Sequence, residues 1–194
     1  WRDNGCPAPY YPNDAELQEM MDYVAGVPLD SRYVSMLKED LGMDGEARAI
    51  RGKNPVDANT LDSLPVLIIG AGMSGLLMGF RLKQAGIPFE IVEKNAGVGG
   101  TWFENRYPGC RVDVPSYCYS YSFVHDYDWP KQFSPQAELK RYFEHCADLF
   151  DLREHISFGT QVERAVYDEE QAAWNVSLRD SHGERQMGAR AVVS

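Results

Sequence analysis

Positive charge is scarce in this sequence: 19 lysine and arginine residues stand against 29 aspartate and glutamate residues, for a formal net charge of −10. Nucleic acids and anionic membranes bind proteins through a basic face, so neither is an expected partner. Long hydrophobic runs are missing too, because no apolar stretch approaches the ~20 residues that a membrane helix needs. The first residues, Trp1 to Asn4, do not begin a signal peptide. These absences predict a protein with no membrane segment and no nucleic-acid partner.

Cysteine pairs and metal-ligand spacings are also missing. The cysteines are Cys6, Cys110, Cys118 and Cys146, and they form no C-x-x-C motif. None of them has metal-ligand spacing with the four histidines, which are His125, His145, His155 and His182. We therefore expect reduced thiols, a cytoplasmic protein and no metal site.

The most informative stretch runs from residue 64 to residue 94. A short apolar strand, Val66 to Ile69, leads directly into Gly70-Ala71-Gly72-Met73-Ser74-Gly75, which is a G-x-G-x-x-G motif. Apolar residues at helical spacing follow, Gly86 ends the predicted helix, and a second strand from Pro88 to Val92 leads to Glu93. The motif alone is weak and occurs as a glycine-rich turn in other α/β proteins. The order strand, glycines, helix, strand and acid within about thirty residues favours a dinucleotide site.

Each glycine of the motif has a distinct physical role. Gly70 permits the tight turn, Gly72 lets the backbone approach a pyrophosphate, and Gly75 lets the helix pack closely on the strand. The free N–H groups at the helix start then face the phosphates, aided by the helix dipole. Glu93 can accept hydrogen bonds from both ribose hydroxyls and would repel a 2′-phosphate. The site therefore suits FAD or NAD better than NADP.

The residues before this motif predict a small helical appendage. Asn13 and Glu16 form a capping box in front of an apolar stripe that includes Leu17, Met20 and Val24. A second helix, capped by Asp30 or Ser31, is expected to end at Gly42. Two short helices cannot bury a core of their own, so we expect them to dock on the rest of the protein or to form a homodimer. The predicted domains are a helical extension with linker, 1–60, and the first part of an FAD-binding domain, 61–194.

Between residues 95 and 129 the sequence predicts irregular structure with polar and aromatic groups. The run 95–102 is rich in glycine and includes Gly100; it is either a surface turn or a second side of the cofactor site. Residues 103–116 hold Arg106, Arg111 and Asp113, and their prolines exclude helix and long strand. Residues 117–129 are rich in aromatics and predict either a β-like stretch in the core or a surface for a planar ring.

The last third of the sequence predicts a helix followed by short strands. Ser134 caps and Pro135 begins a helix that runs to Leu149, with Leu139, Tyr142, Phe143, Cys146, Leu149 and Phe150 on one face. Residues 156–158, 162–167 and 174–178 predict an antiparallel meander. Residues 190–194 resemble a strand that has just begun, so we expect the front part of a larger protein. The fold class is α/β: a three-layer Rossmann-like FAD-binding domain with a parallel sheet and a β-meander, preceded by the helical extension.

The chain resembles the Baeyer–Villiger monooxygenases, a group of flavin-dependent class B monooxygenases. The resemblance covers residues 64–194 and rests on GAGMSG, IVEK, GVGGTWFENRYPGCRVDVPS, the YCYSYSF run and FSPQAELKRYFEHCADLFDLREHISFGTQV. The block from GGTW to RYPGCRVD discriminates most, because other flavin monooxygenases usually diverge there. Residues 13–45 are similar to the N-terminal extension of the 4-hydroxyacetophenone monooxygenase type.

The resemblance implies an enzyme that holds FAD, uses NADPH as reductant and takes O₂ and a ketone as substrates. Its C4a-peroxyflavin attacks the ketone carbonyl, and migration of a carbon substituent gives an ester or lactone. Cofactor contacts are implied at Gly70, Gly72, Ser74, Gly75, Glu93, Gly100, Thr101, Trp102, Arg111, Asp113, Tyr119 and Val162. Asp113 matches a carboxylate that orients a catalytic arginine, and that arginine belongs to a later segment outside residues 1–194.

Two other functions remain open at this point. One is a related class B flavin enzyme that oxidises nitrogen or sulfur. The other is a non-catalytic nucleotide-binding or assembly module, with residues 13–45 as a docking arm.

Overall fold

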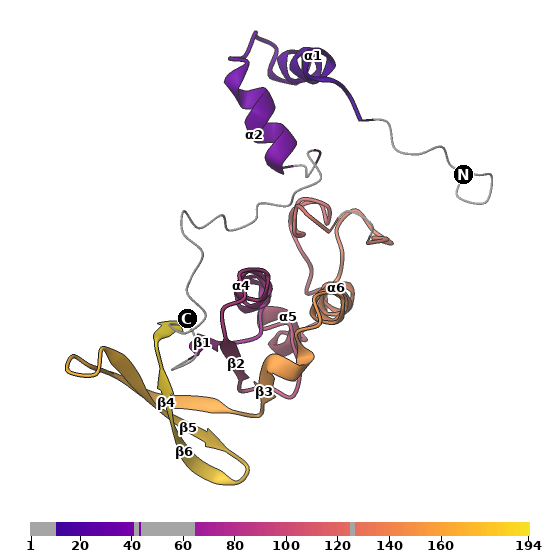
Figure 1. Ribbon diagram of the computed structural model, residues 1–194. Helices are drawn as coiled ribbons and strands as arrows, with labels where there is room; N and C mark the ends of the chain where they lie inside the picture. Colours follow the sequence, from indigo (N-terminus) through magenta and orange to yellow (C-terminus); the bar gives the residue numbers. More distant parts are fainter. Residues whose placement is uncertain (1–10, 41–42, 44–64, 125–126) are drawn as a thin grey trace. The chain divides into compact units, whose positions relative to one another are not determined.

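The computed structural model describes residues 11–40, 43, 65–124 and 127–194. Its elements are α1 (Asp14–Ala25), α2 (Arg32–Asp40), β1 (Val66–Ile69), α4 (Met73–Gln84), β2 (Phe89–Glu93), α5 (Thr101–Glu104), α6 (Gln136–Leu149), the 3-10 turn η2 (Arg153–His155), β3 (Ile156–Phe158), β4 (Gln161–Asp168), β5 (Ala173–Asp180), β6 (Gly183–Ala189) and β7 (Ala191–Val193). Two compact units contain them: α1 and α2 lie in one, and the sheets with α4, α5 and α6 lie in the other (Figure 1).

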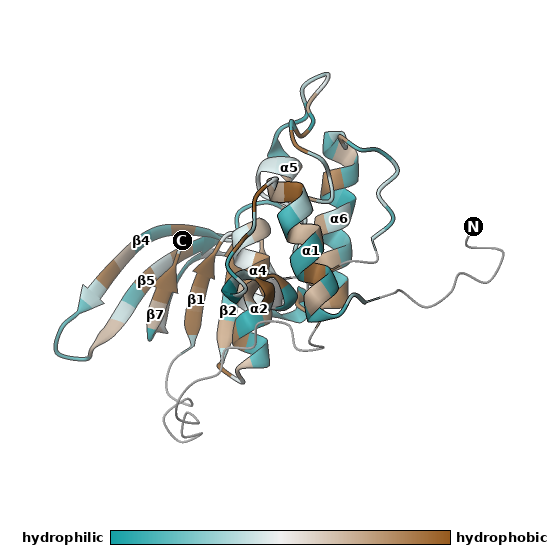
Figure 2. Cartoon of the chain, turned by 90° about the horizontal axis from the view of Figure 1, so that it is seen from above, coloured by the Kyte–Doolittle hydropathy of each residue, from teal (hydrophilic) through white to brown (hydrophobic). Residues whose placement is uncertain are grey.

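A four-stranded parallel sheet forms the centre of the larger unit, in the order β3-β2-β1-β7. Val66 pairs with Phe89 and with Ala191, so β1 lies between β2 and β7. Figure 2 shows β1 and β7 in hydrophobic colours, as expected for strands that are covered on both faces. The pairing of β7 with β1 confirms that residues 190–194 contain a strand.

The meander holds the strands β4, β5 and β6, paired antiparallel in that order. The prediction that residues 156–158 belong to it is wrong: Ile156 pairs in parallel with Ile91 of β2. A three-residue apolar run does not reveal its partner, and the helix α6 before it makes a crossover to a parallel strand possible. The third strand of the meander is β6, which sequence analysis did not identify because most of its residues are polar or small.

The core between the two sheets joins the meander to the Rossmann unit. Its fully or nearly fully buried residues are Leu67, Val92, Val176, Leu178 and Ala189. Leu67 and Val92 come from the parallel sheet, and the other three come from β5 and β6. The meander therefore covers one face of the strands that lead into the glycine motif.

The helix after the glycine motif begins and ends as predicted. Gly86 has φ +67°, and a hydrogen bond of 3.0 Å from the Ile87 N–H to the Leu82 carbonyl closes the last turn in the manner of a C′ glycine. At the other end Gly70 has φ +96°, which is a left-handed conformation that glycine adopts without strain. A Cβ on Gly75 would lie 1.9 Å from the Gly70 carbonyl oxygen. This confirms that Gly75 is required for close packing of α4 against the turn.

Helix α6 matches the predicted span but not every predicted detail. Leu139, Tyr142, Phe143 and Cys146 are fully buried, whereas Leu149 is 53% exposed and does not belong to the buried face. Ser134 does not cap the helix, since Pro135 occupies the N-cap position without a side-chain cap. The Ser134 hydroxyl instead takes part in a buried hydrogen-bond pair, because another buried serine lies within reach.

Two predictions for residues 103–129 also need correction. Phe103 and Glu104 are helical, as the end of the short helix α5, although helix was excluded for the segment 103–116. The prolines of this segment begin at residue 108, so they do not prevent helix at Phe103 and Glu104. The described residues between 117 and 129 form turns and no strand, so the β-like interpretation is wrong. The alternation of aromatic residues here does not arise from strand periodicity.

The smaller unit contains the two predicted N-terminal helices. Asn13 caps α1 by accepting the Ala15 and Glu16 amides at 3.0 and 3.1 Å, and Glu16 completes the capping box. Gly26 ends α1 with φ +70°. The Asp30 carboxylate accepts the amide of Arg32, the first residue of α2, at 2.9 Å. The predicted stop at Gly42 and the domain boundary at residue 60 lie outside the described residues.

Over the described part of the chain, none of the helices combines the length and the apolar character that crossing a bilayer requires. The same residues contain no group of three or more His, Cys, Asp or Glu side chains that could hold a metal ion.

The contact between Gly75 and Gly70 generates the first prediction. We expect Gly75→Ala to lower the free energy of unfolding by about 3 kcal/mol or more, because the added methyl group meets a backbone carbonyl that cannot move aside. Gly72→Ala is the matched control: its Cβ would lie 3.5 Å from the nearest atom, Gly100 Cα, which is ordinary contact. Urea unfolding followed by circular dichroism measures both variants. Equal stability of the two would contradict this account of the turn.

Candidate nucleotide-binding site

Two adjoining cavities lie at the carboxyl ends of β1 and β2. Their volumes are about 440 and 380 Å³, and both are lined by Ile69, Gly70, Gly72, Gly100 and Thr101. The first cavity extends toward Glu93 and the start of β4, and the second extends toward Trp102 and Tyr119. The carboxyl edge of a parallel sheet is the usual place for a ligand in an open α/β fold. Two cavities that meet at a glycine turn fit an elongated ligand whose middle is held by that turn.

The start of α4 faces this meeting point and suits an anion. Gly72 is the N-cap and has no side chain to accept the first helical N–H groups, and the first turn contains no acidic residue. The helix dipole adds partial positive charge at this end of the helix. Met73, Ser74 and Gly75 all line the second cavity, which brings the predicted phosphate-binding residues together.

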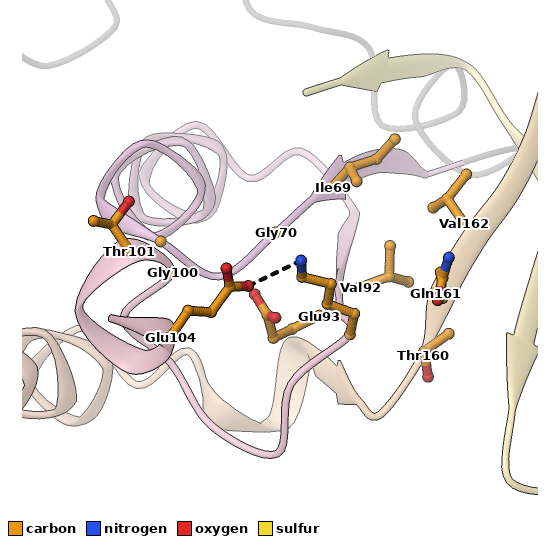
Figure 3. Close-up of a pocket in the computed structure, with 12 residues that line it drawn as sticks. Ile69, Gly70, Val92, Glu93, Gly100, Thr101, Glu104, Thr160, Gln161 and Val162 are labelled. Atoms are coloured by element: carbon orange, nitrogen blue, oxygen red, sulfur yellow. Dashed lines mark ion pairs between the residues drawn. The ribbon is translucent and has the colours of Figure 1, made fainter. Parts of the chain in front are cut away.

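Glu93 ends β2 inside the first cavity and is only 3% exposed. One carboxylate oxygen accepts the Ala71 amide at 2.7 Å and the other accepts the Asn95 amide at 2.8 Å. A buried carboxylate needs such donors, because an unpaired charge away from water is costly. Each oxygen has a second acceptor site, so ribose hydroxyls can still bind. Glu93 therefore holds the glycine turn in place and also presents acceptors to the cavity (Figure 3).

The second glycine-rich segment packs directly on the first. The Gly99 amide donates to the Ala71 carbonyl at 2.9 Å. Gly100 has φ +53°, and a Cβ on it would lie 3.1 Å from Gly72 Cα. Only glycine at residue 100 allows both this conformation and this close approach. Of the two interpretations of residues 95–102, a side of the cavity is the one that agrees with this geometry.

Aromatic side chains close the second cavity. The Trp102 indole N–H donates to the Tyr119 hydroxyl at 3.3 Å, and the two rings meet edge to face with centroids 5.7 Å apart. The turn that carries Tyr119 is held by the buried hydroxyl of Ser116, which lies 2.8 Å from the Ser134 hydroxyl and accepts the Ser134 amide at 3.0 Å. Sequence analysis did not identify this serine pair, because serines separated by 18 residues carry no pattern that indicates contact.

The far side of the first cavity is formed by the connection between β3 and β4. Val162 lines it as predicted, together with Thr160 and Gln161 (Figure 3). The Thr160 amide donates to the Glu93 carbonyl at 2.9 Å, which fixes this connection to the end of β2. Lys94 and Glu104 also line the cavity. Neither was predicted, although Lys94 follows the ribose acid directly and could have been considered on position alone.

Arg111 and Asp113 are not brought into either cavity. Both are exposed, and Arg111 forms an isolated β-bridge with Pro135. The other predicted cofactor residues do line the two cavities: Gly70, Gly72, Ser74, Gly75, Glu93, Gly100, Thr101, Trp102, Tyr119 and Val162. The geometry thus supports a single elongated cleft and separates it from the Arg111 turn.

Comparisons with known proteins agree with this geometry. Residues 68–146 match the family model of an NAD(P)-binding Rossmann-like domain. A Baeyer-Villiger monooxygenase from Streptomyces coelicolor is 46% identical over 112 residues, which cover 57% of this chain and 22% of that protein. One from Pseudomonas aeruginosa is 45% identical over 130 residues, covering 66% of this chain and 24% of that protein.

Among solved structures, the chain is similar to a steroid monooxygenase described as oxidised and bound to NADP. The TM-score is 0.62 and the identity 41%, with 66% of this chain and 25% of that chain covered. The chain thus spans about a quarter of the length of the relatives it matches. The 4-hydroxyacetophenone type is not distinguished by these matches and stays a prediction. The sequence motifs, the Rossmann-like fold and these matches together show that the chain is similar to Baeyer–Villiger monooxygenases over about a quarter of their length.

Proposed function

We propose that this chain provides the FAD site of an FAD- and NADPH-dependent monooxygenase that inserts one oxygen atom of O₂ next to a ketone carbonyl and gives an ester or lactone. The observation that carries the proposal is the pair of cavities joined at the Gly70–Gly72 turn. FAD has two halves joined by a diphosphate, and the uncapped start of α4 lies where that diphosphate would be held. The relatives that are named Baeyer-Villiger monooxygenases supply the reaction type.

The residues of the cleft fit FAD in chemical terms. The cavity beside Glu93 offers a carboxylate to the ribose hydroxyls, and Thr160, Gln161 and Val162 offer backbone groups to the adenine. The second cavity has Trp102 and Tyr119 on the side where the flavin ring would lie. Bound FAD would supply the redox and oxygen chemistry. The chain itself binds the cofactor and orients its flavin half.

Asp113 belongs to the proposal in a different way. Asp113 is exposed and lies on the turn outside the cleft. We propose that its carboxylate orients an arginine from outside the described residues. Together with Arg111, it would also lie near the nicotinamide of NADPH. Such an arginine would stabilise negative charge that develops on oxygen during the reaction.

FAD binding tests the cofactor part of this proposal. We expect the chain to bind FAD and Gly72→Ala to weaken binding by about tenfold or more, equivalent to about 1.4 kcal/mol, because its methyl group fills the approach to the diphosphate. Ser181→Ala, in the exposed turn between β5 and β6 and outside both cavities, is the control. Quenching of flavin fluorescence measures the dissociation constants. Unchanged affinity in the Gly72 variant would contradict the placement of the diphosphate.

Product analysis tests the reaction. The whole protein that carries this sequence, incubated with NADPH, O₂ and a panel of ketones, is expected to form an ester or lactone that contains one atom of labelled oxygen. Mass spectrometry of the products measures the incorporation. Turnover of sulfides or amines without ester formation would instead support the related class B reaction.

We also propose that α1 and α2 form a homodimer contact. A groove of about 410 Å³ on this unit is lined only by apolar residues: Leu17, Met20, Met21, Val24, Ala25, Leu29 and Leu37. Leu17 of the predicted apolar face is buried within this unit, whereas Val24 is 85% exposed and Met20 is 56% exposed. Two short helices gain little stability alone, and a second copy of the same face would bury these side chains.

Val24→Glu tests the dimer. We expect it to convert the dimer to a monomer, because a carboxylate would be buried without a partner at the contact. Val27→Glu is the control, since Val27 is 57% exposed and does not line the groove. Sedimentation velocity measures the oligomeric state. A dimer that survives Val24→Glu, or a parent chain that is monomeric, would refute the proposed contact.

A further inference from the structure

An ion pair lies in the cavity that contains the Glu93 carboxylate. The Lys94 ammonium is 2.9 Å from a Glu104 oxygen, and the Asn95 side-chain amide donates to the same oxygen at 3.0 Å. Figure 3 marks this pair with a dashed line beside Glu104, on the side of the cavity opposite Thr160 and Gln161. Lys94 and Glu104 are both partly exposed, with 59% and 42% of their side-chain surfaces accessible. The pair can therefore meet a ligand.

The lysine is the group in this cavity that could attract a phosphate. It follows Glu93 directly in the sequence, so it is carried by the same strand end that presents acceptors to the ribose. A basic side chain at this position of a Rossmann-type site is what accommodates a 2′-phosphate. FAD and NADPH share an adenosine diphosphate half, and the 2′-phosphate is the difference between them in that half. A protein that holds both cofactors must therefore distinguish FAD from NADPH at the 2′ position of this ribose.

Charge in the cavity already favours an unphosphorylated ribose. Its charged side chains are two carboxylates, Glu93 and Glu104, and one ammonium, Lys94. Hydrogen bonds from Asn95 and Lys94 lower the pKa of Glu104, and the hydrogen bond to Glu104 raises the pKa of Lys94, so both remain charged at neutral pH. Without Glu104, the charges of Glu93 and Lys94 would cancel and the ammonium would have lost its nearest carboxylate.

We propose that Glu104 is a specificity-determining residue: by holding Lys94 in an ion pair, it prevents the lysine from binding a 2′-phosphate and reserves this cavity for a nucleotide with a free 2′-hydroxyl. The inference rests on the proposed function, because it requires that this cavity receives the adenosine half of FAD. Glu93 gives part of the discrimination by repulsion. Glu104 gives the rest of the discrimination by pairing with the Lys94 ammonium, which would otherwise attract the 2′-phosphate.

Two ligands that differ only in the 2′-phosphate test the inference: ADP-ribose and 2′-phospho-ADP-ribose. We expect the parent chain to prefer ADP-ribose. Glu104→Gln should reduce that preference by about fivefold, the effect of one charge contact in a solvent-exposed setting. The double variant Glu104→Gln with Lys94→Met should restore the preference for ADP-ribose, because the improved binding of 2′-phospho-ADP-ribose requires the ammonium that Glu104→Gln sets free. Isothermal titration calorimetry measures the ratio of the two dissociation constants for each variant.

Glu184→Gln controls for the change in net charge. Glu184 is also an exposed glutamate in an ion pair, 2.7 Å from Arg179, and it does not line the cavity. It is expected to leave the preference unchanged. The inference is overturned if Glu104→Gln leaves the ratio as in the parent, or if Glu184→Gln changes it equally. If the folded parent chain binds neither ligand, the proposed nucleotide site fails and this inference fails with it. Binding of ADP-ribose with an unaltered ratio in Glu104→Gln refutes the inference alone.

Discussion

The hydrogen bond from the Ala71 amide to the Glu93 carboxylate connects the parts on which the site depends. It joins the glycine turn after β1 to the end of β2, at 2.7 Å and away from solvent. The second carboxylate oxygen binds the Asn95 amide and thereby fixes the start of the next loop. A charged acceptor makes such bonds stronger than neutral ones, and leaving it unpaired would be costly. One side chain thus sets the relative positions of turn, strand and loop and also offers acceptors to a ligand.

Close contact between glycines then shapes the cleft. Gly75 packs on Gly70, and Gly100 approaches Gly72, so no Cβ separates the backbones at these two contacts. The cavities on either side differ in character. Toward β4 the cavity is lined by carboxylates, an ammonium and backbone groups, and toward Tyr119 it is lined by aromatic rings. This division matches a ligand with a polar nucleoside at one end and a planar ring at the other, which is the basis for preferring FAD.

The sequence predicted the parts of this fold that depend on local rules. The glycine turn, the caps of α1 and α4 and the acid at the end of β2 follow from backbone conformation and spacing over a few residues. Contacts between distant segments could not be predicted in this way. The parallel pairing of β3, the serine pair at 116 and 134 and the position of Glu104 beside Lys94 all depend on tertiary packing. Glu104, at the end of α5, was missed as a cavity residue because the prolines further along suggested that the whole segment 103–116 was irregular.

The central claim is that the two glycine-rich segments and the start of β4 bind one FAD molecule together. Backbone amide NMR during titration with FAD tests it most directly, because each amide reports on its own surroundings. The account predicts that the resonances of residues 70–75, 99–101 and 160–162 change together, with one common dissociation constant. Changes confined to other parts of the chain, or no saturable change at residues 70–75, would contradict it.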